Sequence, residues 1–184
     1  MNTKRAKRKR TSASATPRRG RPTMPEGYIS AKSARGMVPW SRAQELLQGA
    51  SGYWLSTTDP DGAPHLVQQW GAWINDRWFF EGSPEARWAR NLARDPRAVM
   101  SVERGSEIVI VYGTVRLGVK EERDILEDVA RSYVKKYGRG YDYKPTADEF
   151  ETRGINALVP SKALSWDVKT FGKSPTRFLF AAEP

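Results

Sequence analysis

The chain has 184 residues, which is enough for one folded domain with its own core and a terminal tail. It has no cysteine and a single histidine, which excludes disulfides, thiolate metal sites, thiol catalysis and a histidine-rich metal centre. The net charge of +10 lies within residues 1–37, so the rest of the chain has no electrostatic bias towards nucleic acid. No apolar run is long enough to span a bilayer and none is typical of a signal peptide, so we expect a cytoplasmic protein.

Residues 1–23 are expected to form a disordered basic tail, because they contain no Leu, Ile, Val or aromatic side chain to bury. The sequence KRAKRKR at positions 4–10 could condense on nucleic acid or another polyanion. Arg19-Gly20-Arg21-Pro22 resembles the core of an AT-hook, which lies in the minor groove of A·T-rich DNA. A tail that makes such a contact and a tail that is only solvated both remain open.

Residues 24–39 are expected to form an ordered arm that lies across the domain of residues 40–184. A helix is predicted over Trp40–Gly49, with Ser41 as its N-cap. Strands are predicted over residues 53–58, 63–74 and 77–81. A turn at Asp59-Pro60-Asp61-Gly62 and a two-residue hairpin at Asn75-Asp76 connect them.

A helix over residues 83–94 is predicted to begin at Ser83 as N-cap, with Pro84 at the first helical position. Its N-terminus would present free N–H groups and the positive end of the helix dipole, so an anion such as phosphate could bind there. Arg87 lies one turn inside and could add a bidentate cation. Alternatively, Arg87 belongs to a solvated face of the helix and pairs with Glu85 or Asp95.

The second half of the chain continues with strands over residues 97–103 and 107–117. A helix is predicted over residues 120–137, followed by Gly138 as its C′ residue, and Thr146 and Glu149 fit a capping box. The last predicted strands cover residues 155–159, 162–168 and 177–180. Short strands joined by tight turns indicate a mainly β fold with flanking α-helices, built as a small antiparallel barrel.

Seven short motifs stand in order along the chain: YWLSTT (53–58), DGAPH (61–65), WGAW (70–73), FFEGS (79–83), RWARNL (87–92), DPR (95–97) and SPTRF (174–178). This series resembles the pyridoxamine 5′-phosphate oxidase-like flavoproteins over roughly residues 37–180. The resemblance implies a six-stranded antiparallel split β-barrel of the FMN-binding kind. It also implies a homodimer with a flavin-type cofactor in each of two grooves between the subunits, so that residues 40–184 would be the cofactor-binding domain.

Matched by position, the resemblance implies one set of cofactor-binding residues. A strand would run beside the ring system, two segments would lie near the ribityl chain and phosphate, and the C-terminal strand would add an arginine across the dimer. In chain order the set is Val67, Gln68, Gln69, Trp70, Gly71, Ala72, Phe80, Glu81, Ser83, Arg87, Trp88, Trp166 and Arg177. Gly71 and Ala72 are small enough to let a flat ring approach the backbone.

Two departures from the family pattern limit what the resemblance implies. Trp88 stands where many relatives have a phosphate-binding lysine, and it would either pack in the core or cover the cofactor. The Arg and His that bind the substrate phosphate in the true oxidases are absent, since Lys173-Ser174-Pro175-Thr176 stand there. Genuine oxidation of pyridoxamine phosphate is therefore not expected.

The sequence thus predicts an oxidoreductase that uses FMN, or alternatively coenzyme F-420, to transfer hydride to or from a small planar organic substrate. No catalytic acid or base and no metal site is assigned, because the cofactor carries such chemistry. His65 fits a satisfied turn histidine, and Tyr141 and Tyr143 could donate protons near the groove. The alternative is a non-catalytic cofactor-binding barrel that its basic tail tethers to DNA or another polyanion.

Overall fold

The computed structural model describes residues 16–29 and 33–182. Its helices are α1 (Trp40–Gly49), α2 (Arg87–Arg94), α3 (Arg123–Tyr141), α4 (Ala147–Arg153) and the single 3-10 turn η1 (Val168–Thr170). Its strands are β1 (Arg18–Gly20), β2 (Tyr53–Thr58), β3 (Pro64–Gln69), β4 (Ala72–Ile74), β5 (Arg77–Phe80), β6 (Arg97–Arg104), β7 (Glu107–Val119), β8 (Ile155–Asp167) and β9 (Thr176–Leu179).

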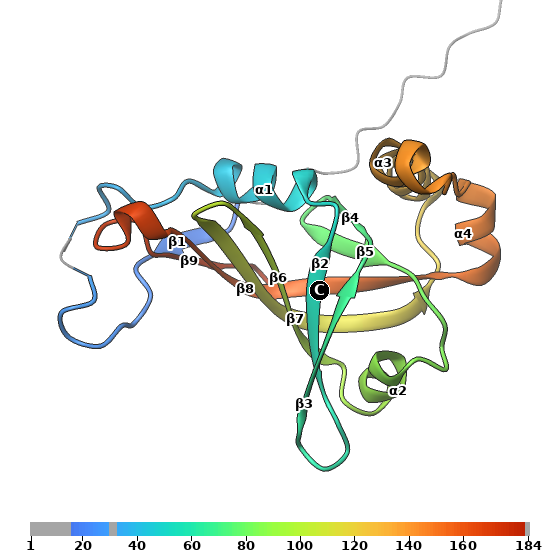
Figure 1. The fold of residues 1–184 in the computed structure, drawn as a ribbon, viewed down its shortest axis with the longest axis horizontal. Helices are drawn as coiled ribbons and strands as arrows, with labels where there is room; N and C mark the ends of the chain where they lie inside the picture. The colour runs from blue at the N-terminus through green and yellow to red at the C-terminus, as the bar shows by residue number, and fades with distance from the viewer. Residues whose placement is uncertain (1–15, 30–32, 183–184) are drawn as a thin grey trace, which may run out of the picture.

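The strands form one antiparallel sheet in the order β1-β9-β8-β7-β6-β2-β3, and β5 joins it by pairing with β8 on one side and β4 on the other (Figure 1). The mainly β fold with flanking helices is therefore confirmed. The sheet is not closed, because its end strands β1 and β3 do not pair with each other. Among the described residues it contains nine strands rather than the six that the resemblance implies.

Two strands differ from their predicted bounds, one because of a contact with α3 and one because of a bulge. The strand predicted over residues 63–74 breaks after β3, because the Gly71 N–H donates to the Tyr137 hydroxyl (2.9 Å) and the Gly71 carbonyl accepts from the Lys136 amine (3.0 Å). The backbone there bonds to side chains of α3 instead of a neighbouring strand. The strands predicted over residues 155–159 and 162–168 join as β8, because the extra residue Ser161 forms a β-bulge after Pro160.

The N-terminal segment corrects the tail prediction. Residues 18–20 form β1, which pairs with β9, so the part of the predicted tail from residue 16 to 23 belongs to the fold (Figure 1). Strand pairing uses backbone groups, so it needs none of the apolar side chains whose absence indicated disorder. The Arg21 guanidinium donates to the carbonyls of Ser33, Arg35, Lys173 and Pro175. Residues 1–15, including the basic block 4–10, lie outside the described residues.

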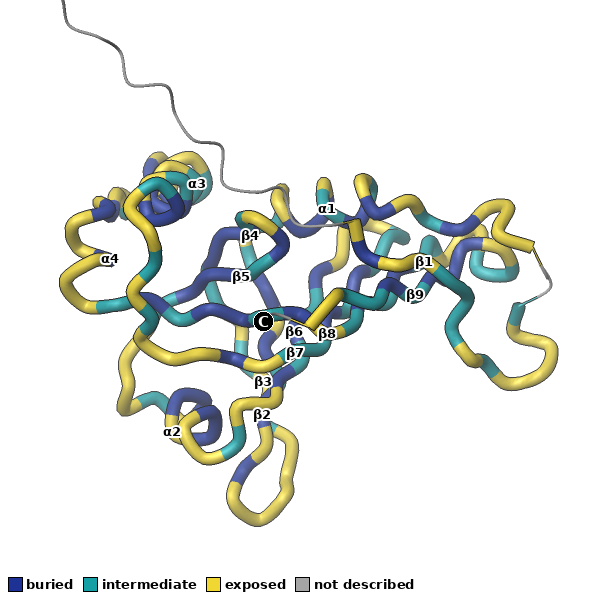
Figure 2. The backbone as a smooth tube through the Cα atoms, turned by 180° about the vertical axis from the view of Figure 1, so that it is seen from behind, coloured by how far each residue is buried: buried dark blue, intermediate teal, exposed yellow. Residues whose placement is uncertain are grey.

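Two hydrophobic clusters fill the two sides of β5, whose side chains alternate between them. Trp78 and Phe80 point into the first cluster, which packs α1 and α2 against the sheet, and Phe79 points into the second. The second cluster packs α3 and α4 against β4, β5 and the start of β8. Figure 2 shows these buried segments of β4 and β5 between the exposed outer turns of the helices.

The helices bear out their predicted positions but not all of their predicted ends. The helix α1 has the expected bounds, although Pro39 and not Ser41 is its N-cap residue. The helix α3 continues through Gly138 and ends at Tyr141, and its C-cap Asp142 adopts the left-handed conformation expected of the glycine (φ 49°). The capping box of Thr146 and Glu149 and the two-residue turn at Asn75-Asp76 are both confirmed.

Candidate functional site

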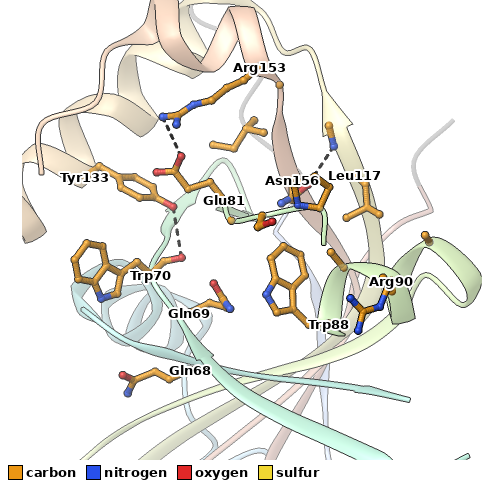
Figure 3. Close-up of a pocket in the computed structure, with 18 of the residues that line it drawn as sticks. Gln68, Gln69, Trp70, Glu81, Trp88, Arg90, Leu117, Tyr133, Arg153 and Asn156 are labelled. Carbon is orange, nitrogen blue, oxygen red and sulfur yellow. Dashed lines mark hydrogen bonds and ion pairs between the residues drawn. The ribbon is translucent and has the colours of Figure 1, made fainter. Parts of the chain in front are cut away.

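A cavity of about 1140 Å³ opens between α2 on one side and α3 and α4 on the other (Figure 3). Its floor is formed by the ends of β3, β7 and β8 and by the segment that follows β5. The lining residues are Gln68, Gln69, Trp70, Glu81, Gly82, Ser83, Pro84, Trp88, Ala89, Arg90, Ala93, Leu117, Gly118, Tyr133, Tyr143, Arg153, Gly154, Ile155 and Asn156. Six of these, namely Gln68, Gln69, Trp70, Glu81, Ser83 and Trp88, belong to the predicted cofactor set.

The end of β3 supplies two amides and an indole to the cavity. Trp70 is held in place because it stacks on Tyr137, with ring centroids 4.4 Å apart and an angle of 7° between the ring planes. The Tyr141 ring also packs against the indole, with ring centroids 4.6 Å apart. The Tyr133 hydroxyl donates to the Trp70 carbonyl at 3.4 Å. This packing makes Trp70 a rigid wall that needs no ligand to hold it.

The helix α2 supplies a second indole opposite. Trp88 is 4% exposed, and its ring centroid lies 5.4 Å from that of Phe80. It therefore belongs to the core and also borders the cavity. Ala89 and Ala93 leave room beside it, and Arg90 lies at the rim, where its guanidinium donates to the Glu85 carbonyl. The sequence left two roles open for Trp88, and the structure combines core packing with a place in the cavity wall.

A polar cluster lines the α3–α4 side of the cavity. The Tyr143 hydroxyl donates to Glu81 at 2.5 Å, and Arg153 contacts both the other oxygen of Glu81 (3.0 Å) and the Tyr143 hydroxyl (3.3 Å). Burial raises the pKa of Tyr143, and its hydrogen bond to Glu81 raises that pKa further. Glu81 therefore enters the cavity with its charge balanced by Arg153 (Figure 3).

Arg87, the predicted phosphate ligand, points elsewhere. Its guanidinium makes two hydrogen bonds to Asp59, whose side chain is 4% exposed, and Asn91 donates a third to the same carboxylate. The pKa of Asp59 is lowered, first by the hydrogen bond from Asn91 and then by Arg87. The alternative of a solvated helical face holds in part, because the Arg87 side chain is 61% exposed, but its partner is Asp59 rather than Glu85 or Asp95. Arg87 does not line the cavity.

The predicted anion site at the start of α2 also needs correction. The helix begins at Arg87 with Ala86 as N-cap, and Ser83 instead caps a turn in which its hydroxyl accepts from the Glu85 N–H at 3.1 Å. Ser83 and Pro84 still line the cavity, but they do not present the first N–H groups of a helix to it.

Four other predicted residues lie in the core rather than at the cavity. Val67 packs against the first cluster, Phe80 belongs to it, and Ala72 is fully buried in the second. The space above Gly71 is occupied by Trp78, since a Cβ on that glycine would lie 2.1 Å from the indole nitrogen. The space left by the missing side chain of Gly71 is therefore filled by Trp78 of β5, whereas we expected a flat ligand to fill it.

Trp166 and Arg177 lie on the outward face of the sheet, and neither lines the cavity. Trp166 packs edge to face against Phe171, with ring centroids 6.2 Å apart. Arg177 pairs with Leu164 across β8 and β9, and its Nε is buried without a hydrogen-bond partner among the described residues. Within one subunit, the structure does not bring these two residues to the rest of the predicted set.

Sequence reasoning missed most of the α4 side of the cavity. Arg153, Gly154, Ile155 and Asn156 come from the end of α4 and the start of β8, and no local motif marks them. Tyr143 was noted as a loop tyrosine near the groove, and it does line the cavity, whereas Tyr141 only packs on Trp70. Arg90 could have been found, because it lies on the same helix three residues after Arg87.

Two further observations concern what the described part of the chain contains. None of its helices is long and apolar enough to cross a membrane. Within residues 16–29 and 33–182, no group of three or more His, Cys, Asp or Glu side chains is arranged to hold a metal ion. The polar groups that line the cavity are side-chain amides, hydroxyls, the Glu81 carboxylate and two arginines.

Residues 40–167 match the family model of pyridoxamine 5′-phosphate oxidase, which covers well over half of the chain. The chain belongs to this family. It matches no curated protein sequence. The matched range includes both walls of the cavity and ends within β8.

Several solved structures are similar to this chain. A conserved hypothetical protein, Rv2991 from Mycobacterium tuberculosis, is 26% identical with a TM-score of 0.59, and the match covers 77% of this chain and 93% of that one. A putative 5-nitroimidazole antibiotic resistance protein from Bacteroides thetaiotaomicron is 14% identical with a TM-score of 0.57, covering 80% and 89%. A FAD-binding protein from Mesorhizobium loti is 14% identical with a TM-score of 0.52, covering 79% and 96%. The last two likenesses concern the fold alone.

Proposed function

We propose that the protein is a homodimeric oxidoreductase that binds a flavin-type cofactor, FMN or coenzyme F-420, in the cavity between α2 and α4. It would transfer hydride to or from a small planar organic substrate. The observation that carries the proposal is the cavity itself, which lies between the indoles of Trp70 and Trp88 in a chain of the pyridoxamine 5′-phosphate oxidase family.

The residues present fit such a group. A volume of about 1140 Å³ is slightly above the usual range of small-molecule sites, so the cavity can hold a tricyclic ring with its side chain. Two rigid indoles offer flat apolar surfaces, and the amides of Gln68 and Gln69 offer hydrogen bonds of both kinds to ring nitrogens and carbonyls.

The phosphate end of the cofactor would lie towards Arg90. Arg87 is committed to Asp59 and Arg153 to Glu81, whereas Arg90 lines the cavity and bonds only to a backbone carbonyl among the described residues. One cation at the rim suits a loosely held phosphate. The single cation at the rim and the tryptophan at position 88, where many relatives have a lysine, leave both F-420 and FMN as candidate cofactors.

A bound flavin or deazaflavin supplies the hydride chemistry, and the protein supplies binding, orientation and water exclusion. Trp70 and Trp88 would orient the ring and keep water from its faces. Tyr143 holds its proton towards Glu81, and burial keeps the phenol protonated, so it would present a neutral polar edge to a substrate. No side chain in the cavity is required as a general base.

Pyridoxamine phosphate is not the proposed substrate. Ser174 and Thr176, which stand in place of the phosphate-binding residues, are buried and use their hydroxyls in the fold. The Ser174 hydroxyl donates to the Asp167 carbonyl (2.9 Å), and the Thr176 hydroxyl accepts from the Val38 N–H (2.8 Å). The two hydroxyls support the turn before β9, so they are not available to bind the phosphate of a substrate.

The outward face of the sheet supports the proposed dimer. One row of paired positions runs Trp54, Ser101, Ile110, Leu164 and Arg177 from β2 to β9. Its apolar members are only partly covered, and Trp54 is 43% exposed. The unpartnered Nε of Arg177 is costly to bury alone and would be satisfied by a cofactor or a second subunit.

Sedimentation tests the dimer directly. Ile110→Lys should convert a dimer into a monomer, because it places a charge in the middle of the apolar row. Val134→Lys on the exposed side of α3 is the matched control and should leave the dimer intact. A wild-type protein that sediments as a monomer at micromolar concentration would rule out the dimer.

The alternative function is a non-catalytic cofactor-binding barrel that its basic tail tethers to DNA or another polyanion. The AT-hook part of that idea weakens, because the Arg21 guanidinium bonds to four backbone carbonyls. The basic block at residues 4–10 lies outside the described residues, so its role stays a prediction. Deleting residues 1–15 should abolish salt-dependent DNA retention without changing cofactor affinity, and unchanged retention would refute the tether.

Absorbance and tryptophan-fluorescence titrations test the proposed function. FMN or F-420 should shift its bands on binding and quench the indoles of Trp70 and Trp88. Binding of FMN alone or of F-420 alone would identify the cofactor. If neither compound binds, the proposed function fails.

A further inference from the structure

A second hollow, of about 560 Å³, lies between the end of α1, β4 and α3. It shares no lining residue with the cofactor cavity, and its volume is within the range of small-molecule sites. Its walls include Gln48 in the last turn of α1, Ser51 after that helix, Trp73 on β4, and Arg131, Lys135 and Lys136 on α3. The proposed function uses none of the residues that line this hollow.

The amine of Lys136, a residue that lines this hollow, is bonded to two neutral oxygens. It donates to the Tyr53 hydroxyl at 2.7 Å and to the Gly71 carbonyl at 3.0 Å. The Tyr53 hydroxyl donates its own proton to the Leu47 carbonyl at 2.6 Å, so it can only accept from the lysine. No carboxylate of the described residues pairs with this amine. A neutral amine has two N–H groups and one lone pair, so it can satisfy both acceptors and keep the lone pair free.

The surroundings raise the share of that neutral form above that of an exposed lysine. Burial, and after it the charge of Lys135, lower the pKa of Lys136 to about 8. The Tyr53 ring face, 5.0 Å away, favours the ammonium form but does not outweigh burial. The lining residues from α1 and β4 are not ionisable, and the ionisable groups that face the amine are Tyr53, Asp128, Arg131, Lys135 and Tyr137.

We propose that Lys136 is a nucleophilic amine that forms an imine with a small carbonyl compound bearing a negative charge. The nitrogen lone pair attacks the carbonyl carbon and a C–N bond forms. The carbonyl oxygen then leaves as water, taking two protons that the nitrogen gives up, so no oxidant or reductant is needed. Lysines activated in this way are typically desolvated or lie beside another cation, and Lys136 meets both conditions.

The charge of the ligand follows from the rim of the hollow. Arg131 is paired with Asp128 at 2.7 Å, which leaves Lys135 as a cation for which the described residues provide no ion pair. A carboxylate or phosphate on the carbonyl compound would take Lys135 as its partner while the carbonyl carbon reaches Lys136. The two lysines are adjacent in sequence, so the modification rate of Lys135 can serve as an internal reference for that of Lys136.

Reductive trapping tests the proposal on the full chain. The protein is incubated near pH 8 with glyoxylate and cyanoborohydride, and the modified lysines are identified by peptide mass spectrometry. Lys136 should be modified at least about tenfold faster than Lys135, because an amine with a pKa of about 8 is about half neutral near pH 8 and only a neutral amine attacks the carbonyl. Lys136→Arg should abolish that modification alone. Lys135→Gln should slow the reaction with glyoxylate but not with the neutral glycolaldehyde.

Several outcomes would overturn the proposal. Equal modification of Lys136 and Lys135 would show that the amine is not activated. Equal rates with glyoxylate and glycolaldehyde in the wild-type protein would remove the requirement for a negative charge. If the Lys136→Arg protein does not fold, the pH profile of the wild-type protein still decides, since modification of Lys136 should reach half its maximum near pH 8 rather than above pH 10.

Discussion

The two walls of the cavity use their charged groups in different ways. On the α2 side, Arg87 turns away to the buried Asp59, so the cavity meets the indole of Trp88. On the α3–α4 side, Glu81, Tyr143 and Arg153 bond to one another within the cavity wall. One wall therefore suits the face of a ring and the other suits the polar edge of a cofactor or substrate.

The α2 side also separates two arginines that the sequence presents as equals. Arg87 and Arg90 lie three residues apart on one helix, yet the first supports the fold and the second faces the cavity rim. The difference arises because the residue beneath Arg87 is a buried carboxylate that needs a partner, whereas Arg90 contacts only the Glu85 carbonyl. The position of each arginine relative to the buried Asp59 thus determines which of the two can bind a ligand.

The largest effect is expected at Trp88. Trp88→Ala should lower the free energy of unfolding by about 3–5 kcal/mol, because it removes a buried indole from the first hydrophobic cluster. Leu117→Ala, at a cavity residue that is 38% exposed, should cost less than about 1 kcal/mol. Denaturant unfolding measures both. A cost for Trp88→Ala as small as that for Leu117→Ala would mean that the α2 wall is not part of the core.

A smaller effect is expected in the polar wall. Glu81→Gln removes the charge that raises the pKa of Tyr143, so that pKa should fall part of the way to its ordinary value while burial keeps it raised. Spectrophotometric titration of the tyrosines, with Tyr143→Phe to identify the signal, measures the change. An unchanged titration curve would show that Glu81 and Tyr143 do not interact in solution.

The pH dependence of the Asp59 contacts gives a further test. The folded pKa of Asp59 lies below its ordinary value near 4, so its stabilising contribution is fully present above about pH 4 and is lost as the pH falls through the folded pKa. Asp59→Asn should therefore be less stable than the wild type at neutral pH, and the difference should shrink below about pH 4. A difference that stays constant down to pH 2 would contradict this assignment.

The contiguous parts of the site could be predicted from the sequence. Gln68, Gln69 and Trp70 come from one strand end, and Glu81 and Ser83 follow the next strand, so short motifs were enough to find them. The opposite wall depends on α4 packing beside α3 and on β8 returning under both, and no local pattern encodes those long-range contacts.

Several errors have identifiable physical origins. The sequence showed that Gly71 is small but not that Trp78 fills the space above it. Ser83 and Pro84 have the composition of a helix start, yet they form a turn that delays the helix to Arg87. Residues 18–20 lack apolar side chains, yet they join the sheet through backbone hydrogen bonds to β9. At Gly71 and at residues 18–20 a tertiary partner overrides the local signal, whereas at Ser83 and Pro84 a local turn does.

The most direct test of the cavity as the cofactor site compares the two arginines of α2. Dissociation constants of FMN and F-420 are measured by fluorescence titration for the wild type, Arg90→Ala and Arg87→Ala, after each variant is shown to be folded. Arg90→Ala should weaken binding by about 1.5–3 kcal/mol, the value of a charged hydrogen bond, and Arg87→Ala should leave it nearly unchanged. The reverse order, with Arg87→Ala as the damaging change, would contradict the placement of the cofactor.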